Sequence, residues 1–90
     1  MKPIRITGYC DGRIAARKLD RQLVEAVIRS PEQIVPDADD PKRKIYQSRF
    51  RDVQGKHKLL RIVIEEKQDE IVAVTVYPTS QLRRYWKGAR

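Results

Sequence analysis

Hydrophobic and polar residues alternate along three stretches in the second half of the chain, and this alternation predicts three strands. The stretches are residues 44–51 (KIYQSRFR), 58–66 (KLLRIVIEE) and 70–77 (EIVAVTVY). A period of two places successive side chains on opposite faces of a sheet. The linkers DVQGK and KQD are short enough for antiparallel hairpins. A fourth extended piece, QIVPD at residues 33–37, contains a proline, so we expect an edge strand or no strand there.

The first third of the chain has helical spacing instead. Residues 9–19 and 20–30 are expected to form two consecutive helices, and the second carries one apolar stripe. Asp20 is placed to cap the second helix, and Pro31 ends it, because the residue before a proline disfavours the helical conformation. The pattern therefore predicts one α+β domain over residues 1–90, with two N-terminal helices packed on one face of a three- or four-stranded antiparallel sheet.

The same alternation assigns the strand side chains to a core face and a second face. The core set is apolar or aromatic: Tyr46, Phe50, Leu60, Ile62, Ile64, Val72, Val74 and Val76. The second set is mostly polar or basic, with a few aliphatic residues: Gln47, Arg49, Arg51, Leu59, Arg61, Val63, Ala73, Thr75 and Tyr77. A turn near Gln68 pairs Ile62 with Val74 and puts Arg61 opposite Thr75. A phosphate-facing surface explains the basic set, and so do arginines that simply shield a solvated sheet face.

The charge of the chain favours anionic partners. It carries 20 Lys and Arg against 12 Asp and Glu, for a net charge of +8 and a pI of about 10.0. Nucleic acid is the first candidate partner, followed by an acidic protein or an anionic membrane surface. A small basic protein with no anionic partner has the same composition.

Basic and aromatic residues also gather on the first helix and at the end of the chain. Arg13 and Arg17 follow Tyr9 at intervals of four residues and line one flank of the helix. The tail, residues 81–90, combines cations with flat rings on which unpaired bases can stack: Arg83, Arg84, Tyr85, Trp86, Lys87 and Arg90. The alternative is that the two rings fold back onto the core, and for Trp86 this alternative is slightly preferred.

Several classes of chemistry lose support from what the sequence lacks. Cys10 is the only cysteine, so no internal disulfide forms, and with one histidine a metal site is improbable. No phosphate-binding glycine loop or serine-hydrolase motif is present, so no cofactor is expected. His57 is a candidate general acid or base, although a lone loop histidine more often has no such role. Without an apolar run of signal or membrane-spanning length, we expect a cytoplasmic protein.

Five segments resemble a family catalogued as a domain of unknown function, number 4258. They are RIAARKL, VEAVIRSPEQIVPD, KIYQSRF, KLLRIVIEE and IVAVTVYPTSQLRRYW, and the resemblance they carry runs from about residue 9 to residue 86. That family is similar in layout to the BrnT and RelE toxins, which are small metal-independent ribonucleases. The resemblance implies a RelE/BrnT-like fold in which RNA is cut by its own 2′-hydroxyl while basic residues stabilise the phosphorane.

The resemblance also assigns roles to particular positions. The matched positions are Arg13, Arg17, Tyr46, Arg61, Thr75 and Tyr77. Tyr9 stands where many members have a histidine, and a tyrosine does not serve as a base near neutral pH without help. Acid–base work would then fall to His57 or Tyr77, or to no residue.

Three hypotheses follow for function. In the first, the chain is a toxin-like endoribonuclease: Arg17, Arg49 and Arg61 bind phosphate, Tyr77 or His57 moves a proton, and Thr75 orients one of them. In the second, the same face and tail form a non-catalytic RNA-binding module that includes Arg51, Arg83, Arg84 and Tyr85. In the third, the basic surface is bound by an acidic, antitoxin-like protein.

Overall fold

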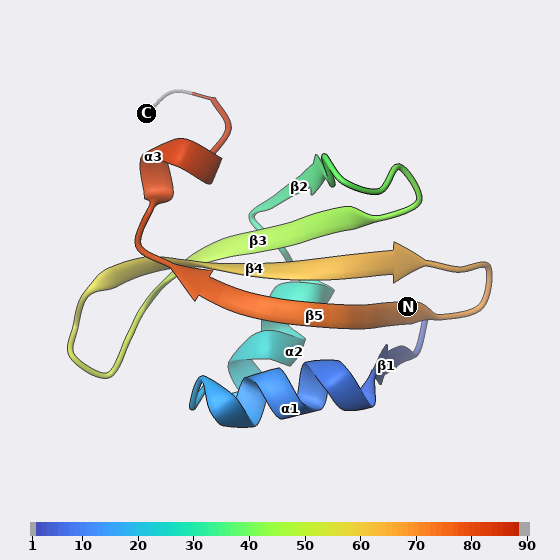
Figure 1. Cartoon of the computed structure of the whole chain (residues 1–90), viewed down its shortest axis with the longest axis horizontal. Coiled ribbons are helices and arrows are strands. Elements are labelled where there is room, and N and C mark those ends of the chain that lie inside the picture. The colour runs from blue at the N-terminus through green and yellow to red at the C-terminus, as the bar shows by residue number, and fades with distance from the viewer. Residues whose placement is uncertain (1, 89–90) are drawn as a thin grey trace.

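The centre of the structure is a five-stranded mixed sheet with the strand order β1-β5-β4-β3-β2 (Figure 1). The computed structural model describes residues 2–88, so Arg90 of the predicted basic tail lies outside it. The strands are β1 (Ile4–Ile6), β2 (Gln33–Pro36), β3 (Lys44–Arg51), β4 (His57–Glu66) and β5 (Ile71–Thr79). The helices are α1 (Gly8–Ala16), α2 (Arg21–Arg29) and α3 (Leu82–Tyr85).

The predicted antiparallel sheet of three or four strands is wrong. Strands β2 to β5 form antiparallel pairs, but β1 adds a fifth strand that runs parallel to β5, with Ile4 opposite Ile71. Three residues are too few to display a period of two, so β1 has no recognisable signal in the sequence. The sheet is therefore larger than expected and mixed.

Helices α1 and α2 lie on one face of the sheet. The hydroxyl of Thr7 caps α1 by accepting a hydrogen bond from Cys10 N (3.0 Å), and Asp20 caps α2 through Gln22 N (2.9 Å). Helix α1 ends at Ala16, earlier than the pattern suggests, because Lys18 adopts a left-handed φ of 54°. The core between helices and sheet contains Cys10, Ile14, Val24, Val27, Ile28, Tyr46, Leu60, Ile62, Ile64, Ala73 and Val76.

A β-bulge in the last hairpin changes the predicted register. Glu66 pairs with Ile71 across the turn, and the register shifts between Val63 and Ile64, which leaves Val74 without a partner. Ile62 therefore pairs with Val76, and Arg61 with Tyr77, in place of the predicted Val74 and Thr75. Without the shift, the spacing set by the turn would place Ile62 opposite Thr75, a core residue against a polar one.

The bulge also corrects the assignment of faces along β5. Ala73, expected on the second face, is fully buried in the core, whereas Val74 is only half-buried and does not belong to the core cluster. Val72 lies on the opposite face from Ala73, since neighbours along a strand point to opposite sides. Beyond the bulge, Val76 faces the core and Thr75 and Tyr77 face away from the helices, as the alternation predicts.

The second face of the sheet, opposite α1 and α2, is partly covered. After β5 the chain crosses over the end of β3 and β4 and forms the short helix α3 (Figure 1). Within residues 2–88, no helix has both the length and the apolar character needed to span a bilayer.

Candidate nucleic-acid interface

Arg61 lies at the centre of the second face, in the middle of strand β4. Its Nε donates to Oε1 of Gln47 (3.0 Å) on β3, and its Nη1 donates to the hydroxyl of Tyr77 (2.5 Å) on β5. Three neighbouring strands therefore contribute one side chain each, and their register brings these side chains together.

Arg61 is a buried cation without an anionic partner. Its exposed fraction is 7%, and no carboxylate within the described residues pairs with it. Aromatic rings take the place of a counter-charge: its Cζ lies 3.9 Å from the ring centre of Tyr85 and 5.7 Å from that of Tyr77. Buried charges are usually paired, because desolvation of an unpaired charge is costly. Ring quadrupoles and neutral hydrogen-bond acceptors offset only part of that cost.

The cover over Arg61 is the tail that contains α3. Gln47 is fully buried, and its Nε2 donates to the carbonyl of Tyr85 (3.0 Å) and to Oε1 of Gln33 (2.8 Å). Gln33 on β2 also bonds the main chain of Lys87 twice, at 2.7 and 3.1 Å. Two glutamines thus attach the tail to the sheet through main-chain groups, and Tyr85 fills the space above Arg61.

Trp86 is held by a second arginine and does not belong to the main core. Cζ of Arg49 lies 4.4 Å from the ring of Trp86, and Arg49 makes two hydrogen bonds to the carboxylate of Glu32 (3.1 and 3.2 Å). These hydrogen bonds hold the pKa of Glu32 below its usual value and raise the pKa of Arg49. The prediction that slightly preferred Trp86 as a core residue is therefore wrong. Arg49 already has an acidic partner, Glu32.

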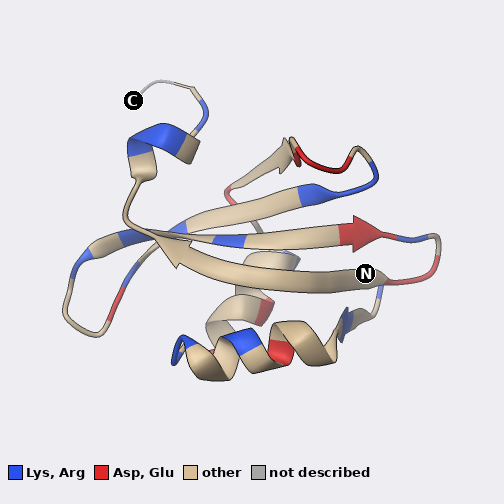
Figure 2. Ribbon diagram, in the orientation of Figure 1, with Lys and Arg blue, Asp and Glu red and all other residues tan. Residues whose placement is uncertain are grey.

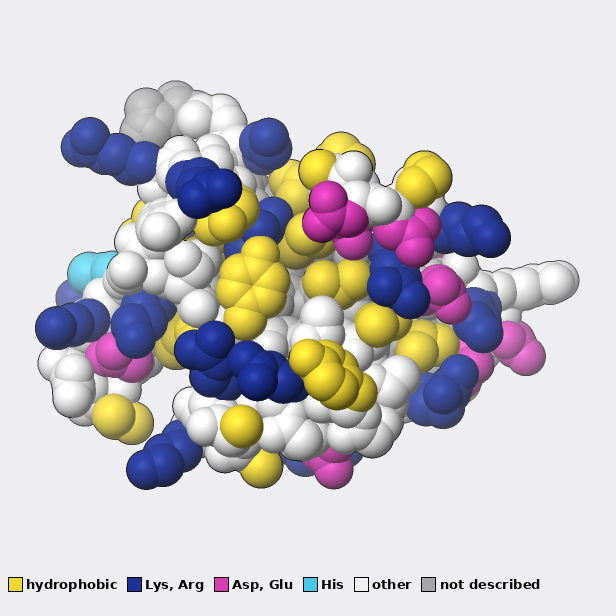
Figure 3. All heavy atoms as spheres, viewed as in Figure 1, with side chains coloured by type: hydrophobic (Ala, Val, Ile, Leu, Met, Phe, Trp, Pro, Cys, Tyr) yellow, Lys and Arg dark blue, Asp and Glu magenta, His cyan; other side chains and the backbone are white. Residues whose placement is uncertain are grey.

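The charges of the protein differ between the two ends of the sheet (Figure 2). At the end formed by the β2–β3 loop and the β4–β5 turn, cations pair with nearby carboxylates, as Arg5 does with Glu70 (3.1 Å) and Lys44 with Glu66 (3.0 Å). At the other end lie the β3–β4 turn and α3, which we call the basic end. The cations there without a carboxylate partner in residues 2–88 are Arg51, Lys56, Arg83, Arg84 and Lys87. The space-filling view shows basic side chains at both ends, while most of the acidic ones gather at the end away from α3 (Figure 3).

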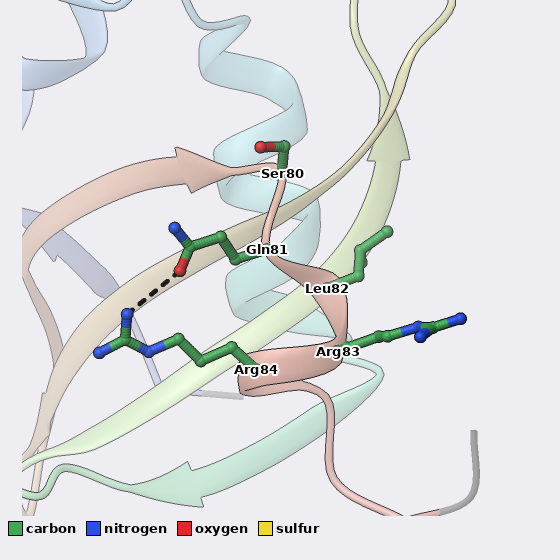
Figure 4. A pocket seen from close by; sticks show the side chains of 5 residues that line it. All are labelled: Ser80, Gln81, Leu82, Arg83 and Arg84. Atoms are coloured by element: carbon green, nitrogen blue, oxygen red, sulfur yellow. Dashed lines mark hydrogen bonds between the residues drawn. The ribbon is translucent and has the colours of Figure 1, made fainter.

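A hollow beside α3 extends the basic end. It has a volume of about 560 Å³ and is lined by residues 80–84 (Figure 4). Arg84 bonds back to Oε1 of Gln81 (3.3 Å) and its Cζ lies 5.2 Å from the ring of Tyr85, whereas Arg83 points away from them. Arg83 is thus displayed to solvent, and Arg84 contributes to the stacking around Tyr85.

Thr75 and His57 are the remaining residues of the catalytic hypothesis, and only Thr75 lies near Arg61. Thr75 lies on the second face opposite Val63, next to the Arg61–Tyr77 pair, but no hydrogen bond joins it to Arg61 in the described structure. His57 is exposed at the start of β4, four residues or about 13 Å along the strand from Arg61. It pairs with Arg51 and belongs to the basic end.

Tyr46 and the pair Arg13 and Arg17, to which the resemblance assigns roles, lie away from Arg61. Tyr46 faces the helices, is buried in the core and donates a hydrogen bond to Glu66, so it cannot join Arg61. Burial, together with Glu66, raises the pKa of Tyr46. Arg13 and Arg17 lie at α1, which runs beside β5, so β5 and β4 separate them from α3 (Figure 1). The helix flank and the basic tail therefore do not form one continuous ridge.

The sequence analysis missed Gln33 and the tail contacts of Gln47. No local pattern marks them, because their partners are main-chain groups more than thirty residues away. Within residues 2–88, no group of three His, Cys, Asp or Glu side chains is placed to hold a metal ion.

Comparison with protein-family models, curated proteins and solved structures found no match to this chain. The resemblance to family 4258 therefore stays a prediction from the sequence. The same holds for the antitoxin-like partner.

Proposed function

We propose that the protein binds single-stranded RNA through its basic end and the adjoining second face of the sheet. One observation carries the proposal: five cations at the basic end have no carboxylate partner in residues 2–88, and the rings of Tyr85 and Trp86 lie at the same end, stacked on arginines. Phosphates bind to such cations and release counterions, and unpaired bases stack on such rings.

The ion pairs at the opposite end of the sheet are a second reason to place RNA binding at the basic end. At the opposite end, Arg5, Arg43 and Lys44 already form ion pairs with carboxylates, which reduces the charge they offer to a ligand. A duplex would have to be read by an element inserted into a groove, whereas a short helix with arginines and rings suits a flexible single strand.

The test is a titration of labelled single-stranded RNA, followed by fluorescence anisotropy, over a salt series from about 50 to 200 mM. The logarithm of the binding constant should fall linearly with that of the salt concentration, by about 0.7 for each phosphate neutralised on a single strand. Arg83→Ala should weaken binding and make the slope shallower by about that amount.

Lys42→Ala is the matched control, because Lys42 is an exposed cation at the opposite end with no ion pair in residues 2–88. It removes the same charge and should leave the slope unchanged. Equal losses from both variants would mean that net charge, and not the basic end, attracts RNA. Affinity that does not respond to salt would remove the nucleic-acid proposal altogether.

A second candidate function, metal-independent RNA cleavage, is favoured by the hydrogen bond between Arg61 and Tyr77. In this reaction the 2′-hydroxyl gives its proton to solvent, its oxygen attacks the neighbouring phosphorus, and the 5′-oxygen leaves. A guanidinium group would stabilise the charge of the phosphorane. Because the Tyr77 hydroxyl accepts its bond from Arg61, its own proton is left to protonate the leaving oxygen. RNA would have to reach Arg61, which Tyr85 covers.

A further inference from the structure

Tyr85 occupies a space on the second face that has the polar groups of a nucleotide site. Its ring stacks on the guanidinium group of Arg61 at 3.9 Å, and Arg84 approaches the same ring at 5.2 Å. Nε2 of Gln47 donates a hydrogen bond to the main-chain carbonyl of Tyr85. The flat guanidinium group of Arg61 and the N–H donor of Gln47 are the features that would hold a stacked base and its phosphate.

Arg61 and Gln47 are already fixed in position without the tail. Arg61 is held by Gln47 and Tyr77, and Gln47 by Gln33, through bonds between side chains of the sheet. If Tyr85 left, Arg61 would be exposed as a cation with no carboxylate partner, and one N–H of Gln47 would lack an acceptor. Both groups, each at least nine-tenths buried now, point into the vacated space.

The segment that covers this space is weakly anchored. Helix α3 spans four residues, none of which is buried, and it has no side-chain N-cap. Apart from ring stacking, three hydrogen bonds attach the tail to the sheet: Gln47 and Gln33 each donate one to a tail carbonyl, and Lys87 N donates one to Gln33. Segments with few buried contacts open at low free-energy cost.

We infer that Tyr85 is a displaceable occupant of a base-binding slot, and that one nucleotide of single-stranded RNA replaces it. The base stacks on Arg61 in place of the tyrosine ring, an oxygen of the nucleotide accepts from Gln47, and the phosphate lies near Arg61. The inference rests on the proposed RNA binding and adds that the tail competes with the RNA for this slot.

The experiment compares the full-length wild type with Tyr85→Ala and Tyr85→Phe in titrations with single-stranded polyuridylate. Removal of the competing ring should tighten binding by about 2- to 30-fold, the range expected when one stacked cation–ring contact no longer has to be broken. Tyr85→Phe keeps the ring and should bind like the wild type. In an Arg61→Ala background, Tyr85→Ala should give no gain, because the slot has lost its stacking surface.

Trp86, the only tryptophan, reports on the tail in the unmodified protein. Its ring is stacked on Arg49 and half-buried, so release of the tail should shift its emission to longer wavelength when polyuridylate binds. Inorganic polyphosphate has the charge without the bases, and it should leave the emission unchanged.

The outcomes separate the two proposals. If the wild type binds polyuridylate but Tyr85→Ala binds equally or more weakly, the tail is a fixed part of the surface and the slot is refuted while RNA binding stands. An equal emission shift with polyphosphate would also refute the slot. If neither protein binds polyuridylate, both proposals are wrong.

Discussion

Placing an aspartate at two neighbouring positions of β5 tests the bulge on which the geometry of the second face depends. In the structure Ala73 is fully buried in the core, and Val74 is half-buried and unpaired. The alternation of the sequence alone assigns them the other way round, with Val74 in the core. Ala73→Asp and Val74→Asp therefore distinguish the two arrangements, because each predicts the opposite order of damage.

The expected magnitudes follow from burial. Ala73→Asp leaves an uncompensated carboxyl group in the core, which costs about 3–5 kcal/mol. That is a large part of the roughly 5–15 kcal/mol that stabilises a domain. A fully buried valine contributes about 1.5–3 kcal/mol, so Val74→Asp at a half-buried position should cost about 1 kcal/mol. For a chain of this size, each kcal/mol lowers the melting temperature by about 4–8 °C.

The assay is thermal and urea unfolding followed by circular dichroism. Ala73→Asp should lower the melting temperature by at least about 12 °C, and Val74→Asp by less than about 8 °C. Ala73→Asn has nearly the size of aspartate without its charge and should be less damaging at neutral pH. If Val74→Asp is as destabilising as Ala73→Asp, the bulge is absent and the pairing of Arg61 with Tyr77 fails with it.

Two further predictions concern the Arg61–Tyr77 pair and the Tyr46–Glu66 pair. If the protein cleaves RNA in EDTA, Arg61→Ala and Tyr77→Phe should each lower the cleavage rate by a factor of about 10²–10³, as loss of one preorganised donor does. Lys42→Ala, the control, should cleave at the wild-type rate. Equal cleavage by all four proteins, or no cleavage by the wild type, contradicts the enzyme hypothesis. Hydrogen bonds from Tyr46 and Lys44 hold the pKa of Glu66 below its ordinary value, so this contribution to stability is present at neutral pH and is lost as the pH falls through the folded value. Tyr46→Phe should lower the urea midpoint at neutral pH and flatten its fall on acidification, and an unchanged pH profile would show that the pair does not contribute.

Alternation along the strands predicted the part of the site that depends on single strands. It placed Gln47 and Arg61 on one face and Tyr46 on the other, and the structure agrees. The resemblance, by contrast, grouped Tyr46 with Arg61, and the structure separates them. Side-chain direction follows from local backbone geometry, which explains why the pattern was the better guide for these residues.

The features that escaped prediction depend on contacts between distant segments. Strand β1 has only three residues and forms by pairing with β5, more than sixty residues along the chain. The bulge at Val74 has no glycine or proline to mark it; it reconciles the spacing of the turn with the apolar pattern of two strands. The cover of Tyr85 over Arg61 joins residues that share no periodicity.

The two ends of the sheet show why stability alone does not account for the basic end. Ion pairs such as Arg5–Glu70 offset the charge of the far end at little cost in solvation. Arg61 is different, because an apolar side chain of similar volume at a buried position is often as stabilising as a charged one, or more so. Its guanidinium group is nevertheless kept buried by two neutral side chains, Gln47 and Tyr77, and by the ring of Tyr85. Stability does not require this arrangement, and in the proposed function the phosphate of the RNA supplies the negative charge that Arg61 lacks.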